Sequence, residues 1–151
     1  MTLGEKLTDL SYLREMSGND HSIIKEMIDI FIEQVPEFLE EISESFESRD
    51  WHALGAFSHK AKSSVRTMGM EKTGGYLERL EHFAKGNLKL ELQIKQEKGI
   101  EFSPSDEKKW VNVKYETKND IELKYIPELV EGFLDQCPLA IKELKDTLGQ
   151  L

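Results

Sequence analysis

The sequence is poor in cysteine, in proline and in positive charge, and each shortage excludes something. Its one cysteine, Cys137, excludes an internal disulfide and fits a reducing compartment. The formal net charge of -9 argues against nucleic acid or an anionic membrane as the main partner. No run is apolar and long enough to cross a bilayer, and the N-terminus lacks the basic and apolar runs of a signal peptide. We therefore expect a cytoplasmic protein.

The composition is otherwise that of a globular protein. Hydrophobic residues make up 38% of the chain and charged residues 32%, and 151 residues suffice for one domain with a real core. We expect a single domain over residues 1–151. No additional apolar seam is visible in the helical pattern, so we expect a monomer.

Apolar residues recur with three-then-four spacing through most of the chain, which is typical of amphipathic helices. The pattern predicts a short helix over residues 10–16 and a long one from Asp20 or Ser22 to about residue 47. A third helix follows the cap Asp50 and ends at Gly69, a fourth covers residues 70–85 up to Gly86, and the last covers about 127–148. The helical part of the domain is thus about residues 9–86 and 120–148.

Residues 87–119, between the last two of these helices, have a different pattern. Leucine or isoleucine alternates with polar residues from Leu88 to Ile94, and Val111, Val113 and Tyr115 alternate again. Alternation is the period of a strand, so we expect a β-hairpin insertion here. Leucine, glutamate, glutamine and lysine also form helices well, and a longer fourth helix over residues 88–98 remains the alternative.

The third predicted helix carries the most informative side chain, His59. At about 100° per residue, His59 points roughly 140° away from the middle of the apolar stripe. Lys62, Ser63 and Arg66 share its side of the helix. A neutral imidazole is a nucleophile near physiological pH, and a lysine one turn away can bind phosphoryl oxygens. The pattern therefore favours an exposed histidine that accepts a phosphoryl group.

The run His59-Lys60-Ala61-Lys62-Ser63-Ser64 resembles the signature of histidine phosphotransfer (HPt) domains of two-component phosphorelays. The turn Gly18-Asn19-Asp20 and the run Met68-Gly69-Met70 agree with the same family. The resemblance implies an all-α fold, an antiparallel four-helix bundle with a short helix before it. It also implies that His59 is the phosphoacceptor and that Lys62 stabilises the phosphoryl group. Ser63 stands where the family most often has glycine, and the insertion is a second departure.

The same resemblance implies the partners. The phosphoryl group would come from an aspartate on a receiver domain, which brings its own magnesium ion, and would pass to another. No phosphate-binding loop or glycine-rich ATP lid is present, so we expect no kinase activity, no bound cofactor and no enzyme activity of its own. The residues expected to contact the partner surround His59: Gly55, Ala56, Lys60, Ser63, Arg66 and Glu81.

Other interpretations of these residues are open. Glu81 and Lys62 are each open to a simpler reading as solvated surface residues. A zinc site at His52 and His59 is disfavoured, because seven residues of helix separate them by about 10 Å, against metal–ligand bonds near 2 Å. The stronger rival is a non-catalytic bundle that docks receiver domains or a kinase without relaying phosphate.

Overall fold

The computed structural model describes residues 7–116 and 126–149, and all regular structure within these two ranges is helical. The helices are α1 (Ser11–Met16), α2 (His21–Glu47), α3 (Trp51–Thr67), α4 (Glu71–Glu97), α5 (Pro104–Val113) and α6 (Ile126–Leu148). None of these helices is both long enough and apolar enough to pass through a membrane. The expected helical bundle is confirmed. Residues 1–6, 117–125 and 150–151 lie outside the description, including parts of the predicted insertion and of the range 120–148.

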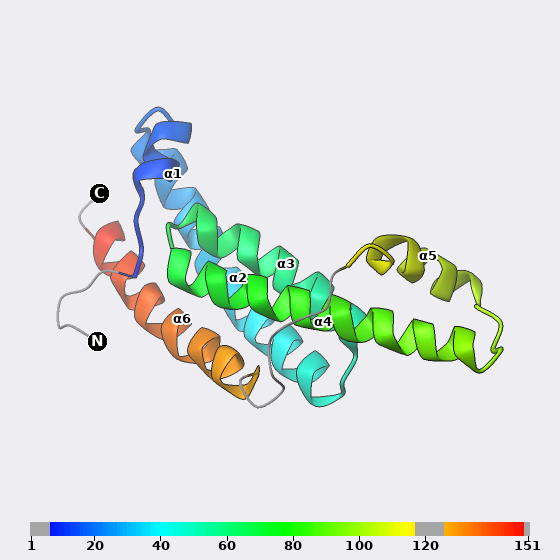
Figure 1. Ribbon diagram of the computed structural model, residues 1–151. Coiled ribbons are helices and arrows are strands. Elements are labelled where there is room, and N and C mark those ends of the chain that lie inside the picture. Colours follow the sequence, from blue (N-terminus) through cyan, green and yellow to red (C-terminus); the bar gives the residue numbers. More distant parts are fainter. Residues whose placement is uncertain (1–6, 117–125, 150–151) are drawn as a thin grey trace.

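The helix boundaries follow from local capping chemistry. The Asp20 carboxylate accepts from the backbone N–H groups of Ser22 and Ile23, so Asp20 and not Ser22 caps α2. Asp50 accepts from the backbone N–H of Ala53 and caps α3 as expected. The turns that separate α2, α3 and α4 are short, which brings consecutive helices side by side (Figure 1).

The main core lies among α2, α3, α4 and α6, with α3 and α4 in the most extensive contact. Each helix contributes the stripe that its sequence period requires. The fully buried members are Ile24, Ile28 and Ile42 from α2, Leu54, Ala61 and Val65 from α3, Leu77, Leu80 and Ala84 from α4, and Phe133, Ala140 and Leu144 from α6. This packing leaves one face of α3 outside the core, and that face carries His59.

The predicted β-hairpin is wrong. Residues 88–97 continue α4 without interruption through Gly86, and residues 104–113 form α5. Leu88 and Leu92, four residues apart, are buried, whereas Leu90 and Ile94 face solvent. Leu88 and Leu92 lie on one face of the helix, so only every second apolar residue of the alternating set is used for packing.

Helix α5 folds back along the projecting end of α4 (Figure 1). It begins with a capping box, in which Ser103 and Asp106 each bond the other's backbone N–H, and Pro104 occupies the first turn. A helix therefore begins between the two segments that were predicted as strands. A second, small core of Leu88, Leu92 and Val113, with Phe102 and Trp110 against it, joins the two helices.

Candidate functional site

His59 lies on the outer face of α3, and its side chain is 63% exposed. The ring is nevertheless oriented, because Nδ1 lies 3.0 Å from Oε2 and 3.1 Å from Oε1 of Glu81 on α4. Ser58, the residue before it, is small and fully buried, so α3 approaches α4 closely at this level. The imidazole is therefore held at its Nδ1 edge and open to solvent elsewhere.

Glu81 is the buried anchor of the site, with its side chain 5% exposed. Lys62 donates to its Oε1 at 2.7 Å, and Lys85 donates to its Oε2 at 2.9 Å. Burial acts to raise the pKa of the Glu81 carboxyl, but the hydrogen bonds from Lys62, Lys85 and His59 outweigh it and lower that pKa from 4.5 to about 2. Glu81 is thus an anion at neutral pH, and its reading as a solvated surface residue is wrong.

The Glu81 anion decides which nitrogen of His59 carries the proton. An ionised carboxylate only accepts hydrogen bonds, so Nδ1 must be the N–H donor in the contact between them. In the neutral ring the lone pair is then on Nε2, which lies on the other side of the imidazole. This arrangement offers an oriented nucleophile from the exposed side of the ring.

Lys62 is less free than its position on the helix suggested. Its side chain is 16% exposed and lies against Glu81, where it reaches the same carboxylate as His59. An ammonium group has three N–H donors, so one bond to Glu81 leaves two for another acceptor. Lys62 is therefore placed beside the imidazole and still able to bind an anion there.

Glu81, one of the residues expected to contact a partner, is buried, and the others fall into two groups. Ala56, Lys60 and Ser63 are exposed around His59, with the Lys60 ammonium over the ring of Phe38. Gly55 is buried against α4, and Arg66 is turned toward α4. The Arg66 guanidinium contacts Glu78 at 3.3 Å and Glu71 at 3.8 Å.

A groove of about 380 Å³ lies beside His59, between α3, α4 and α5. Its α3 side consists of Trp51, His52, Gly55, Ala56 and His59, its α4 side of Lys85 and Leu88, and its α5 side of Lys109, Asn112 and Val113. The sequence reasoning missed Lys85, although its spacing of four residues from Glu81 on one helix is a usable signal. It missed Lys109 and Asn112 because no helix was predicted over residues 104–113.

Comparison with known families agrees with this geometry. The family model of the Hpt domain matches residues 26–102, which is half of the chain, and this chain belongs to the Hpt domain family. The match includes the whole of α3 and α4, with the site on them. Hpt domains take part in phosphotransfer in two-component systems and interact with receiver domains. Neither the curated proteins nor the solved structures gave a match.

Proposed function

We propose that this chain is a phosphorelay intermediate. His59 takes a phosphoryl group from the aspartyl phosphate of one receiver domain and gives it to the aspartate of another. The observation that carries the proposal is the exposed imidazole whose Nδ1 is held by the buried Glu81 anion. A histidine that served only packing or solubility would need no such orientation.

The transfer follows from these contacts. The Nε2 lone pair attacks phosphorus, an N–P bond forms, and the P–O bond to the donor aspartate breaks as its carboxylate leaves. The ring then carries the phosphoryl group on Nε2 and a proton on Nδ1, so it is positively charged. The Nδ1–H group keeps its hydrogen bond to Glu81. The anion at 3.0 Å offsets that charge. The return reaction to a second aspartate is the same step reversed.

Lys62 is proposed to bind the incoming phosphoryl oxygens with the donors that Glu81 leaves free. Positioning and charge neutralisation are most of what phosphoryl transfer requires, so one histidine, one carboxylate and one lysine are a sufficient set. The exposed Ala56, Lys60 and Ser63 are proposed to contact the receiver domain around His59. We expect no label on His59 from ATP alone.

The test is transfer from a receiver domain carrying labelled aspartyl phosphate. Wild-type protein is expected to acquire acid-labile label, and His59→Gln is expected to acquire none. His21→Gln, at the exposed first residue of α2 and outside the groove lining, is the matched control and should still accept label. If no receiver of the same genome labels the wild type but one still binds it, the chain is a docking module and the relay proposal is wrong.

A further inference from the structure

The groove beside His59 is not built by the bundle alone. One of its sides belongs to α5, which lies outside the family match to residues 26–102. Lys109 stands three residues before Asn112 and four before Val113 in the second half of α5. These residues therefore lie on one face of the helix, and that face borders the groove. Any domain that reaches Nε2 of His59 from this side meets that face.

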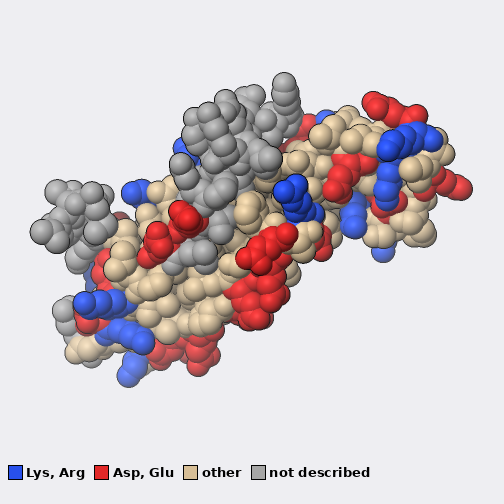
Figure 2. All heavy atoms as spheres, turned by 90° about the horizontal axis from the view of Figure 1, so that it is seen from below, with Lys and Arg blue, Asp and Glu red and all other residues tan. Residues whose placement is uncertain are grey.

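The charge of the groove is opposite to that of the chain. Its titratable lining residues are His52, His59, Lys85 and Lys109, and the described lining contains no acid. Lys85 is paired with the buried Glu81 at 2.9 Å, so Lys109 is the cation of this lining that is left to meet a partner. The chain as a whole has a net charge of -9, and acidic side chains gather in a patch near the middle of the face in Figure 2. A lysine on the α5 side of the groove, in a protein that is otherwise acidic, favours a partner whose contacting surface is acidic.

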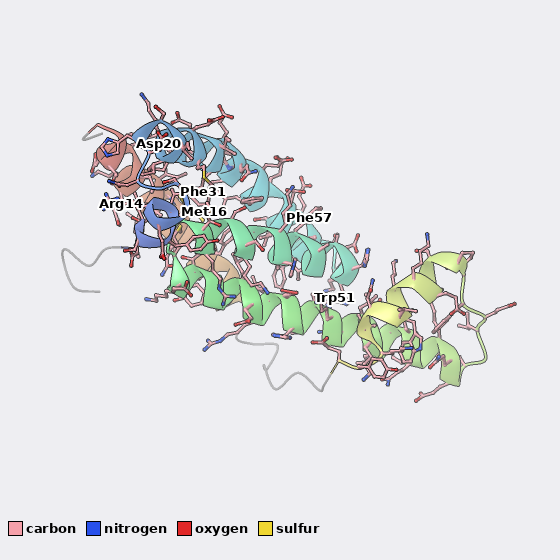
Figure 3. All side chains as sticks on the ribbon, turned by 90° about the horizontal axis from the view of Figure 1, so that it is seen from above. Arg14, Met16, Asp20, Phe31, Trp51 and Phe57 are labelled. Carbon is pink, nitrogen blue, oxygen red and sulfur yellow. The ribbon has the colours of Figure 1, made fainter. Side chains whose placement is uncertain are left out.

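The α5 side of the groove is also held in place at both ends of the helix. At its start, Lys95 on α4 contacts Asp106 at 3.0 Å. Just beyond its end, His82 bonds the Glu116 carboxylate, and Lys89 donates to the Glu116 carbonyl oxygen. Trp51, at the first turn of α3, packs against both the main core and the small core under α5 (Figure 3). The groove is thus preformed in the free protein.

We propose that α5 is a partner-selecting wall of the docking site, with Lys109 and Asn112 as its specificity-determining residues. The partner is a receiver domain whose surface next to the phosphorylated aspartate is acidic, and Lys109 pairs with that surface while Asn112 sets the width of the groove. This inference rests on the proposed function for the identity of the partner. It adds that α5 decides which receiver domain is accepted.

The first experiment compares two charge reversals on α5 in the full chain. Lys109→Glu removes the groove cation, whereas Lys108→Glu makes the same change at an exposed neighbour outside the groove. We expect Lys109→Glu to raise the Kd for the cognate receiver domain and the KM of transfer about tenfold or more, with little change in kcat. The Kd and KM of Lys108→Glu should stay near the wild-type values. Added salt should reduce the difference between the two variants.

A small phosphoryl donor separates docking from chemistry. Phosphoramidate needs no protein surface, so Lys109→Glu should be labelled on His59 by it as fast as wild type. Slower labelling by phosphoramidate would mean that Lys109 acts on the imidazole itself and would overturn the docking role. Equal Kd and KM values for the two charge reversals would overturn it as well.

A steric pair tests the groove independently of charge. Asn112→Trp adds bulk inside the groove, and Val111→Trp adds the same bulk at a position that is 61% exposed and outside it. Only Asn112→Trp should weaken receiver binding, with both variants retaining the wild-type helix signal. If the two tryptophan variants bind the receiver domain equally well, α5 is not a wall of the docking site. A wild type that binds but does not transfer would end the relay proposal, while a weakened Kd in Lys109→Glu would still support the docking surface.

Discussion

At the scale of single residues, Glu81 does two jobs with one carboxylate. It accepts from Nδ1 of His59 and from the ammonium groups of Lys62 and Lys85. The first contact orients the nucleophile, and the other two keep a buried carboxylate ionised. The two jobs respond differently to substitution, because orientation needs only an acceptor, whereas the lysines need a negative charge.

Glu81→Gln and Glu81→Leu therefore separate orientation from charge. The glutamine keeps an acceptor for Nδ1–H, so transfer from a phosphorylated receiver should stay within a few-fold of wild type. The leucine removes the acceptor, and transfer should fall about 10- to 100-fold, by analogy with the loss of the carboxylate that orients a metal-binding histidine. Single-turnover transfer rates measure both. Wild-type rates in Glu81→Leu would show that the contact does not orient the ring.

The lowered pKa of Glu81 predicts how stability depends on pH. Its pKa is about 2 in the folded chain against an ordinary value of 4.5, so the ionised form is favoured by folding. The stabilisation is complete above pH 4.5 and is lost as the pH falls through 4.5 toward 2. Its full size is on the order of 3 kcal/mol. Urea unfolding should find wild type more stable than Glu81→Gln at pH 7, with the gap closing near pH 2. A gap independent of pH would contradict this assignment.

At the scale of elements, the turn between α3 and α4 is fixed by contact with the N-terminal segment. Gly69 has φ +70°, and a Cβ there would overlap the backbone of Asp9, whose N–H donates to the carbonyl oxygen of Met68. Gly99, after α4, also has φ +70° but has nothing within 4 Å of its Cβ position. The two glycines share a backbone conformation and differ in surroundings.

Alanine substitutions at these two positions should thus differ in free energy of unfolding. Gly99→Ala should cost about 1–2 kcal/mol, the usual price of a left-handed conformation for a residue with a Cβ. Gly69→Ala should cost clearly more, because the segment at Asp9 must also move. Thermal and urea unfolding measure the difference. Equal losses would mean that the Asp9 contact adds nothing to stability.

The sequence predicted the helices that bury a continuous apolar stripe. The prediction was wrong where the apolar pattern was compatible with two kinds of secondary structure. The outward direction of His59 and the cap at Asp50 depend on local spacing and were predicted, whereas the sequence left the cap of α2 open between Asp20 and Ser22. The alternation from Leu88 to Ile94 is compatible with a strand or a helix, and only the contact of Leu88 and Leu92 with α5 decides it. The burial of Glu81 likewise depends on α3 and α4 packing together, which no local pattern contains.

At the scale of the whole molecule, the described part of the chain has two hydrophobic cores of unequal size, and Trp51 packs against both. The large core holds the bundle, and the small one holds α5 on the end of α4. Trp51 packs edge-on against Phe83 of the bundle, with ring centroids 5.3 Å apart, and also against the small core. Phe102, whose ring makes an edge contact with Trp110, belongs to the small core alone. A small satellite core opens more easily than the main one, because its free energy of opening comes from fewer buried contacts.

Hydrogen exchange can show whether the α5 wall opens separately from the bundle. In Phe102→Ala, amides of α5 should exchange faster, while those at the centre of α2 keep their wild-type protection, because the large core is untouched. In Trp51→Ala, both sets should lose protection, since that ring packs on both cores. If Phe102→Ala lowers protection in α2 as much as in α5, the two cores unfold as one unit. The groove beside His59 would then be as stable as the bundle itself.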